Sequence, residues 1–86
     1  SKSVIGGYAG LSPGVVVGDN SVVGAKSSIF PDVKIGNGVR IGSECSVFMG
    51  SIIPDNVKIK SHSLVTKECT IQEGETWGGN PAVKIQ

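Results

Sequence analysis

The stretch IFPDVKIGNGVRIGSECSV, residues 29–47, carries an aliphatic residue at every sixth position. The same count runs in both directions along the chain without an insertion, and none of its members is polar. They are Ile5, Leu11, Val17, Val23, Ile29, Ile35, Ile41, Val47, Ile53, Ile59, Val65, Ile71, Trp77 and Val83. A period of six excludes an amphipathic helix, whose apolar residues repeat about every 3.6 residues. The chain is therefore predicted to be a repeat protein.

A second set of residues, small or β-branched, lies two positions before the aliphatic ones. It comprises Ala9, Val15, Ser21, Ser27, Val33, Val39, Cys45, Ser51, Val57, Ser63 and Cys69. We interpret both sets as inward positions of a coil of three short strands, with Gly, Asn and Asp at the corners because they accept tight-turn backbone angles. Three hexads make an 18-residue coil, so the sequence holds between four and five coils. The prediction is an all-β parallel β-helix whose inner stack runs from Ile5 to Val83.

The number and spacing of the acidic, His and Cys residues argue against a calcium site, a zinc site and a disulfide. Asp19, Asn37, Asp55 and Glu73 fall one per coil in a corner column, which is typical of turn residues and lacks the clustered spacing of a calcium loop. The single His, His62, cannot supply the several His ligands of a catalytic zinc. No metal site is predicted. The two cysteines, 24 residues apart at inward positions, are predicted to be free thiols.

The charge balance and the lengths of the apolar runs disfavour nucleic acid and membranes as partners. Eight Lys and Arg residues stand against seven Asp and Glu, so no basic field favours nucleic acid or an anionic membrane. No apolar run reaches the roughly 20 residues of a membrane span, and the first residues lack a signal-peptide pattern. We therefore expect a cytoplasmic protein without nucleic-acid or membrane partners.

The segment VKIGNGVRIG, residues 33–42, and the terminal GGNPA, residues 78–82, resemble hexapeptide-repeat acyltransferases. The resemblance covers nearly the whole chain and implies a left-handed β-helix. It also implies an enzyme that moves an acyl group from coenzyme A to a hydroxyl or amine of a small-molecule acceptor. Residues 1–86 are expected to form one β-helix domain, the C-terminal portion of a longer one, closed by residues 77–86. The acidic segment ending at Pro81 also resembles β-helical units appended to nonribosomal-peptide-synthetase-like proteins.

The same resemblance suggests site residues. Ser61, Thr66, Lys67 and Lys84 match positions that contact coenzyme A, and cations suit its phosphates. The general base of these enzymes is a His two or more coils ahead of residues 33–42, where this chain has none. His62 is thus a candidate base at a corner, with a plain exposed corner residue and a ligand contact as its alternatives.

Residues eighteen apart lie one above another in successive coils. This count places an outward column at Ser12, Phe30, Phe48 and Thr66, beside Met49. An outward patch of Phe30, Phe48 and Met49 predicts a homotrimer face, which is also how the resembling enzymes assemble. The alternative is that the rings merely cover the sheet. Two functions remain open, an acyltransferase or its cofactor-binding fragment, and a β-helical trimerisation module without chemistry of its own.

Overall fold

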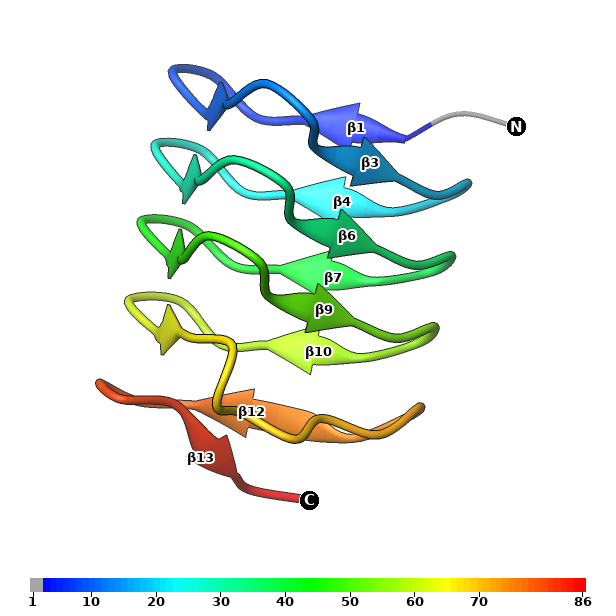
Figure 1. Cartoon of the computed structure of the whole chain (residues 1–86), viewed down its shortest axis with the longest axis vertical. Helices are drawn as coiled ribbons and strands as arrows, with labels where there is room; N and C mark the ends of the chain where they lie inside the picture. The colour runs from blue at the N-terminus through cyan, green and yellow to red at the C-terminus, as the bar shows by residue number, and fades with distance from the viewer. Residues whose placement is uncertain (1–2) are drawn as a thin grey trace.

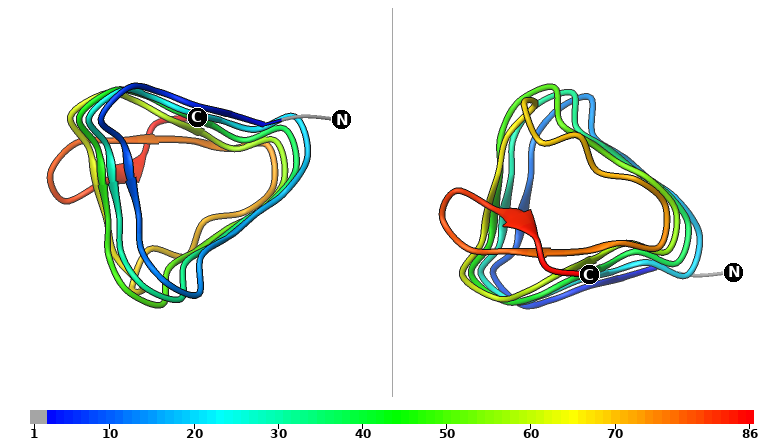
Figure 2. Two further views of the ribbon diagram at one scale, coloured as in Figure 1. Left: turned by 90° about the horizontal axis from the view of Figure 1, so that it is seen from above. Right: turned by 90° about the horizontal axis from the view of Figure 1, so that it is seen from below.

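The computed structural model describes residues 3–86 and shows a left-handed parallel β-helix of about four coils (Figure 1). Seen along its axis the chain traces a triangle, with one sheet on each side (Figure 2). Sheet A contains β1 (Val4–Ile5), β4 (Val22–Val23), β7 (Arg40–Ile41), β10 (Lys58–Ile59), β12 (Thr76–Gly78) and β13 (Val83–Lys84). Sheet B contains β2 (Gly10–Leu11), β5 (Ser28–Ile29), β8 (Ser46–Val47) and β11 (Leu64–Val65). Sheet C contains β3 (Val16–Val17), β6 (Lys34–Ile35) and β9 (Ile52–Ile53).

The register of the strands is the predicted one of eighteen residues per coil. Ile41 pairs with Val23 above and with Ile59 below, and Ile29 pairs with Val47. In the strands from β4 to β11 the second residue points inward and is nearly inaccessible. The buried column runs through Val23, Ile29, Ile35, Ile41, Val47, Ile53, Ile59, Val65, Ile71 and Trp77. The central part of the predicted stack is thereby confirmed.

The predicted stack keeps its register in the first coil, where Ile5 pairs with Val23 and Leu11 pairs with Ile29. It is wrong at Val83. Ile5 and Leu11 are 39% and 43% exposed because the first coil is covered from one side only. Val83 is 58% exposed because it does not continue the repeat. Its strand, β13, turns back and pairs antiparallel with β12, so that Val83 lies opposite Gly78. Ala82, rather than Val83, is buried in the core of this end, and its amide donates to the carbonyl of Leu64 at 2.8 Å.

Buried hydroxyls at the second inward position tie neighbouring coils together. Ser21 Oγ donates to the carbonyl of Gly36 at 2.7 Å and accepts from the amide of Val39 at 3.1 Å. Ser27 repeats this arrangement on the next side of the triangle. Within residues 3–86 no buried side-chain nitrogen or oxygen lacks a partner. Ser51 and Ser63 donate instead to a carbonyl three residues earlier in their own coil. A polar residue is therefore tolerated at these positions because a backbone carbonyl lies within reach of its hydroxyl.

The corners are built from a third period of six, which falls on residues with a left-handed backbone. Positive φ angles occur at Tyr8, Gly14, Asn20, Lys26, Asp32, Gly38, Glu44, Gly50, Asn56 and His62. The expectation that Gly, Asn and Asp serve the corners is too narrow, because Tyr8, Lys26, Glu44 and His62 adopt the same conformation. The geometry of the coil requires the positive φ angle at this position, and residue types that rarely adopt it are accepted there as well.

The turns from sheet C to sheet A carry a ladder of side-chain hydrogen bonds. The amide of Asp19 donates to Asn37 Oδ1 at 2.7 Å, and the amide of Asn37 donates to Asp55 Oδ1 at 2.8 Å. The interpretation of this column as turn residues is confirmed for these three members. The side-chain oxygens of Asn37 and Asp55 therefore link each corner to the corner of the preceding coil.

Candidate functional site

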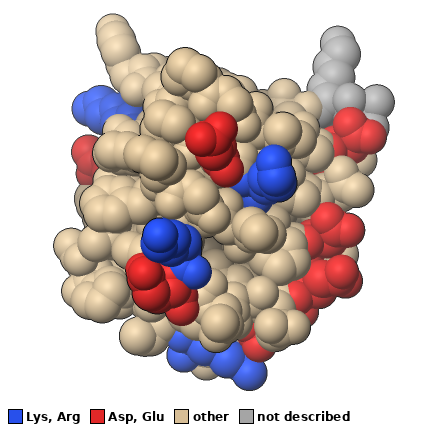
Figure 3. All heavy atoms as spheres, viewed as in Figure 1, with Lys and Arg blue, Asp and Glu red and all other residues tan. Residues whose placement is uncertain are grey.

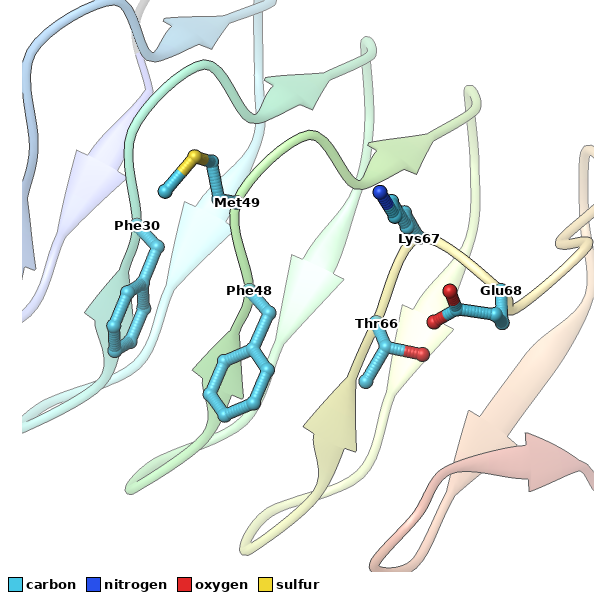
Figure 4. Close-up of a pocket in the computed structure, with 6 residues that line it drawn as sticks. All are labelled: Phe30, Phe48, Met49, Thr66, Lys67 and Glu68. Carbon is cyan, nitrogen blue, oxygen red and sulfur yellow. The ribbon is translucent and has the colours of Figure 1, made fainter.

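A pocket of about 330 Å³ opens on the outer face of sheet B (Figure 4). Its lining comprises Phe30, Phe48, Met49, Thr66, Lys67 and Glu68. Figure 4 shows Phe30, Phe48 and Thr66 in a row along the axis, each following the inward residue of its strand. The two rings meet edge to face with centroids 5.0 Å apart. Apolar side chains therefore form the floor, and Thr66, Lys67 and Glu68 form a polar end.

In most coils the corresponding position on the other two sheets is a glycine with no room for a side chain, and the exceptions are Lys60 on sheet A and Pro54 on sheet C. A Cβ added to Gly42 on sheet A would lie 2.5 Å from the backbone nitrogen of Ser61 in the next coil. On sheet C, a Cβ at Gly36 would lie 2.8 Å from the backbone nitrogen of Asp55. The equivalent column on sheet B instead carries Phe30, Phe48 and Thr66. The shape of this corner thus allows side chains to project outward.

The apolar surface continues beyond the pocket toward the first coil. A shallower hollow of about 300 Å³ is lined by Gly10, Leu11, Ser12, Ser28, Ile29 and Phe30. Phe30 lines both hollows, and Phe30, Phe48 and Met49 are 38%, 40% and 58% exposed. The outward orientation predicted for these three residues is confirmed. Figure 3 shows that charged side chains are sparse over much of the viewed face, while acidic ones gather along one edge.

Of the four residues expected to contact coenzyme A, the structure brings two together. Thr66 and Lys67 line the pocket, and Thr66 Oγ1 lies 3.8 Å from Cys69 Sγ. Ser61 lies in the turn from sheet A to sheet B, where its Oγ accepts the amide of Ser43 at 3.0 Å. Lys84 lies on β13 and its Nζ is 3.2 Å from Glu75 Oε2. Neither Ser61 nor Lys84 is among the pocket-lining residues.

His62 is an exposed corner residue paired with a carboxylate of the preceding coil. Its Nδ1 lies 3.2 Å from Glu44 Oε1, and the side chain is 72% exposed. This pairing engages Nδ1 of the ring with a carboxylate. The pair is separated from the pocket by the width of sheet B, since β11 follows His62 and precedes Thr66.

The sequence analysis missed Glu75 as the residue that fastens the closing segment. Its carboxylate accepts the amide of Gln72 and the indole nitrogen of Trp77, both at 2.9 Å, and pairs with Lys84. The backbone hydrogen bond from Gln72, followed by the Trp77 and Lys84 interactions, lowers the pKa of the Glu75 carboxyl. The only sequence signal was an acidic residue two positions before an inward tryptophan.

The cysteines are free thiols, as predicted. Cys45 is buried, with its Sγ 3.1 Å from the carbonyl oxygen of Lys60, and burial raises the pKa of its thiol. Among residues 3–86, no three His, Cys, Asp or Glu side chains gather in a way that could hold a metal ion. The same part of the chain has no helix long and apolar enough to cross a membrane.

Solved structures with the same fold include several acyl-transferring enzymes. A UDP-N-acetylglucosamine O-acyltransferase from Moraxella catarrhalis is 26% identical with a TM-score of 0.78, over 95% of this chain and 34% of that one. A maltose O-acetyltransferase from Clostridium difficile is 22% identical with a TM-score of 0.62, over 100% and 68%. The acetyltransferase domain of PglB from Neisseria gonorrhoeae is 18% identical with a TM-score of 0.56, over 98% and 58%. The chain thus spans about a third of the Moraxella enzyme.

A search of curated protein sequences gives no match. A family model does match the sequence itself, over residues 2–30 and 32–67, which is more than half of the 86 residues. Its description is hexapeptide repeat of succinyl-transferase. The matched range includes the inward column from Ile5 to Val65 and every residue of the pocket floor. Together with the coil register of the structure, this match shows that the chain belongs to the hexapeptide-repeat family.

Proposed function

We propose that this chain is the acyl-donor-binding part of an acyltransferase that uses a coenzyme A thioester. The observation that carries the proposal is the pocket on sheet B, which joins Thr66 and Lys67 to an apolar floor of Phe30, Phe48 and Met49. The apolar floor suits the thioester arm and its acyl group, whereas the Lys67 ammonium suits a phosphate. The Moraxella relative, an O-acyltransferase, and the maltose O-acetyltransferase support the same reaction class.

In the proposed reaction the acceptor hydroxyl or amine loses its proton to a general base and attacks the thioester carbonyl carbon. The carbon–sulfur bond then breaks, and the coenzyme A thiolate takes up a proton as it leaves. His62 is the candidate base, since Glu44 at Nδ1 would hold the imidazole with Nε2 directed outward. Because β11 separates His62 from the pocket, we expect the chain on its own to transfer acyl groups weakly or not at all.

Assembly into a homotrimer through the face of Phe30, Phe48 and Met49 is part of the proposal. A slender prism has little interior of its own, and a flat apolar face shared between copies adds burial. The pocket would then lie beside the boundary between subunits, where a second copy could approach Thr66 and Lys67. The exposure of the three apolar residues also supports the second candidate function, a trimerisation module that binds no coenzyme A.

Titration calorimetry with coenzyme A and acetyl-coenzyme A separates the two candidates. We expect binding by the wild type and an affinity about tenfold lower for Lys67→Ala, because one charge-assisted contact is lost. Lys34→Ala is the matched control, since Lys34 is also an exposed lysine and lies on sheet C. Indistinguishable isotherms for the wild type and Lys67→Ala would show that the sheet B pocket is not the acyl-donor site. A wild type that does not bind coenzyme A would favour the second candidate, the trimerisation module.

A further inference from the structure

Sheet A carries a cluster of three cations, which we call the basic ladder, formed by Arg40, Lys58 and Lys60. Arg40 on β7 and Lys58 on β10 are direct partners in parallel strands. Both are exposed, and each precedes a buried isoleucine, so both side chains project outward from the same face. Parallel strands place such partners about 4.8 Å apart, and Lys60 follows Lys58 on that face at about 6.6 Å. The three positive charges therefore lie close together.

Within the described residues 3–86, no carboxylate lies at ion-pair distance from this cluster. The ion pairs among residues 3–86 join His62 to Glu44 and Lys84 to Glu75, and neither involves the ladder. Like charges on directly paired strand positions destabilise a sheet. The repeat does not require them, since the same outward column carries Val4 and Val22 in the earlier coils. Lys34 shows the contrast on sheet C, where its paired neighbours are the uncharged Val16 and Ile52.

Lys60 is held in place by the coil below. It occupies the position that is glycine in the two preceding coils, at Gly24 and Gly42, where a Cβ would collide with backbone 2.5 Å away. Below Lys60 lies Gly78, and a Cβ built there would meet Lys60 Cβ at 3.1 Å, Lys60 Cδ at 3.4 Å and Ile85 Cδ1 at 3.0 Å. The aliphatic stem of Lys60 is thus packed over Gly78 while its ammonium reaches solvent. Such packing reduces the side-chain entropy lost on binding a ligand.

We infer that the basic ladder of Arg40, Lys58 and Lys60 binds a small molecule bearing two adjacent phosphate groups. Two cations one coil apart match two neighbouring phosphates, the guanidinium of Arg40 can donate two parallel hydrogen bonds, and Lys60 adds a third charge. The site lies on sheet A, whereas the pocket proposed for the acyl donor lies on sheet B. It is therefore a second site, and its existence does not depend on acyl transfer.

The test uses the whole chain with two probes, inorganic pyrophosphate and ADP, titrated by calorimetry at low salt and mapped by amide NMR shifts. We expect shifts centred on Arg40, Lys58 and Lys60, and an affinity at least about tenfold lower for the double variant Arg40→Gln/Lys58→Gln. Lys34→Gln, which removes one exposed sheet cation elsewhere, should bind as the wild type does. Lys58→Gln alone serves if the double variant fails to give a wild-type circular dichroism spectrum.

Loss of binding in the ladder variants but not in Lys34→Gln supports the site, whichever probe is bound. Binding of ADP without pyrophosphate, lost in the same variants, supports it and assigns the nucleoside to the adjoining surface. The inference is overturned if neither probe binds at millimolar concentration, or if binding survives in the double variant. It is also overturned if Lys34→Gln weakens binding equally, since attraction would then follow net charge alone. Failure of coenzyme A to bind the sheet B pocket leaves these outcomes unchanged.

Discussion

The rings of Phe30 and Phe48 lie on successive coils and pack edge to face, with their centroids 5.0 Å apart on the outside of the β-helix. Edge-to-face pairs contribute about 0.5–1.5 kcal/mol beyond the area they bury. Each ring nevertheless leaves more than a third of its residue surface exposed. The pair is therefore both an ordered floor for the pocket and an apolar surface suited to further burial.

Replacing both rings by serine, in Phe30→Ser/Phe48→Ser, should convert a trimer into monomers, because the shared apolar face is removed. The wild-type melting temperature should rise with protein concentration and that of the variant should not. Light scattering at micromolar concentration measures the mass directly. A monomeric wild type, or a double variant that stays trimeric, would contradict the assembly.

Ile41→Asp should prevent folding, because it places an unpaired carboxylate in the middle of the buried column. An uncompensated buried charge costs several kcal/mol, comparable with the whole stability of a small domain, about 5–15 kcal/mol. The control is Lys34→Asp, which puts the same side chain at an outward strand position. Thermal melts followed by circular dichroism compare the two, and a cooperative wild-type melt for Ile41→Asp would refute the register.

Gly42→Ala should destabilise the fold by roughly 1–3 kcal/mol, since its Cβ would lie 2.5 Å from the next coil. Gly10→Ala is the matched control, because a Cβ at Gly10 meets nothing within 4 Å. Chemical denaturation of both variants measures the difference. Equal losses at the two positions would show that coil spacing does not decide where glycine is needed.

Glu75 should make the closing segment sensitive to acid. Because its pKa is lowered in the folded state, chiefly by the Gln72 amide, its stabilisation is complete above the ordinary carboxyl pKa. That stabilisation is lost as the pH falls through the lowered pKa of the folded state. Trp77, the single tryptophan, donates to Glu75 and so reports on the segment by fluorescence.

In Glu75→Gln the acid-dependent part of the Trp77 signal should disappear and the segment should be looser at neutral pH. Glu68→Gln is the control, since Glu68 is an exposed carboxylate at the pocket rim. An unchanged acid transition in Glu75→Gln would show that other groups fasten the C-terminus.

The central fold could be predicted from the sequence because one geometric rule, the period of six, places every buried residue of the column from Val23 to Trp77. It failed at Val83, where β13 reverses direction and leaves the repeat. The register holds at Ile5 and Leu11, but a period does not tell whether another coil covers a residue. It also underestimated the corners, where Lys26 and His62 adopt an angle usually associated with glycine. There the coil overrides local preference.

For the site, column arithmetic correctly stacked Phe30 and Phe48 with Thr66 on one outer face. The same arithmetic places Ser61 beneath Ser43 in a different turn, so its separation from Thr66 could have been found from the sequence. The position of Lys84 could not, because β13 reverses direction and leaves the repeat. The role of Glu75 depends on that reversal as well.

The most direct test of the proposed function is the map of amide NMR shifts on adding coenzyme A to the whole chain. We predict shifts at Phe48, Met49, Thr66, Lys67 and Glu68, with residues of sheet C such as Lys34 unmoved. The basic ladder on sheet A shifts as well if the diphosphate of coenzyme A also occupies it. Shifts confined to sheet A or sheet C, or no shifts with saturating coenzyme A, would contradict the assignment of the sheet B pocket as the acyl-donor site.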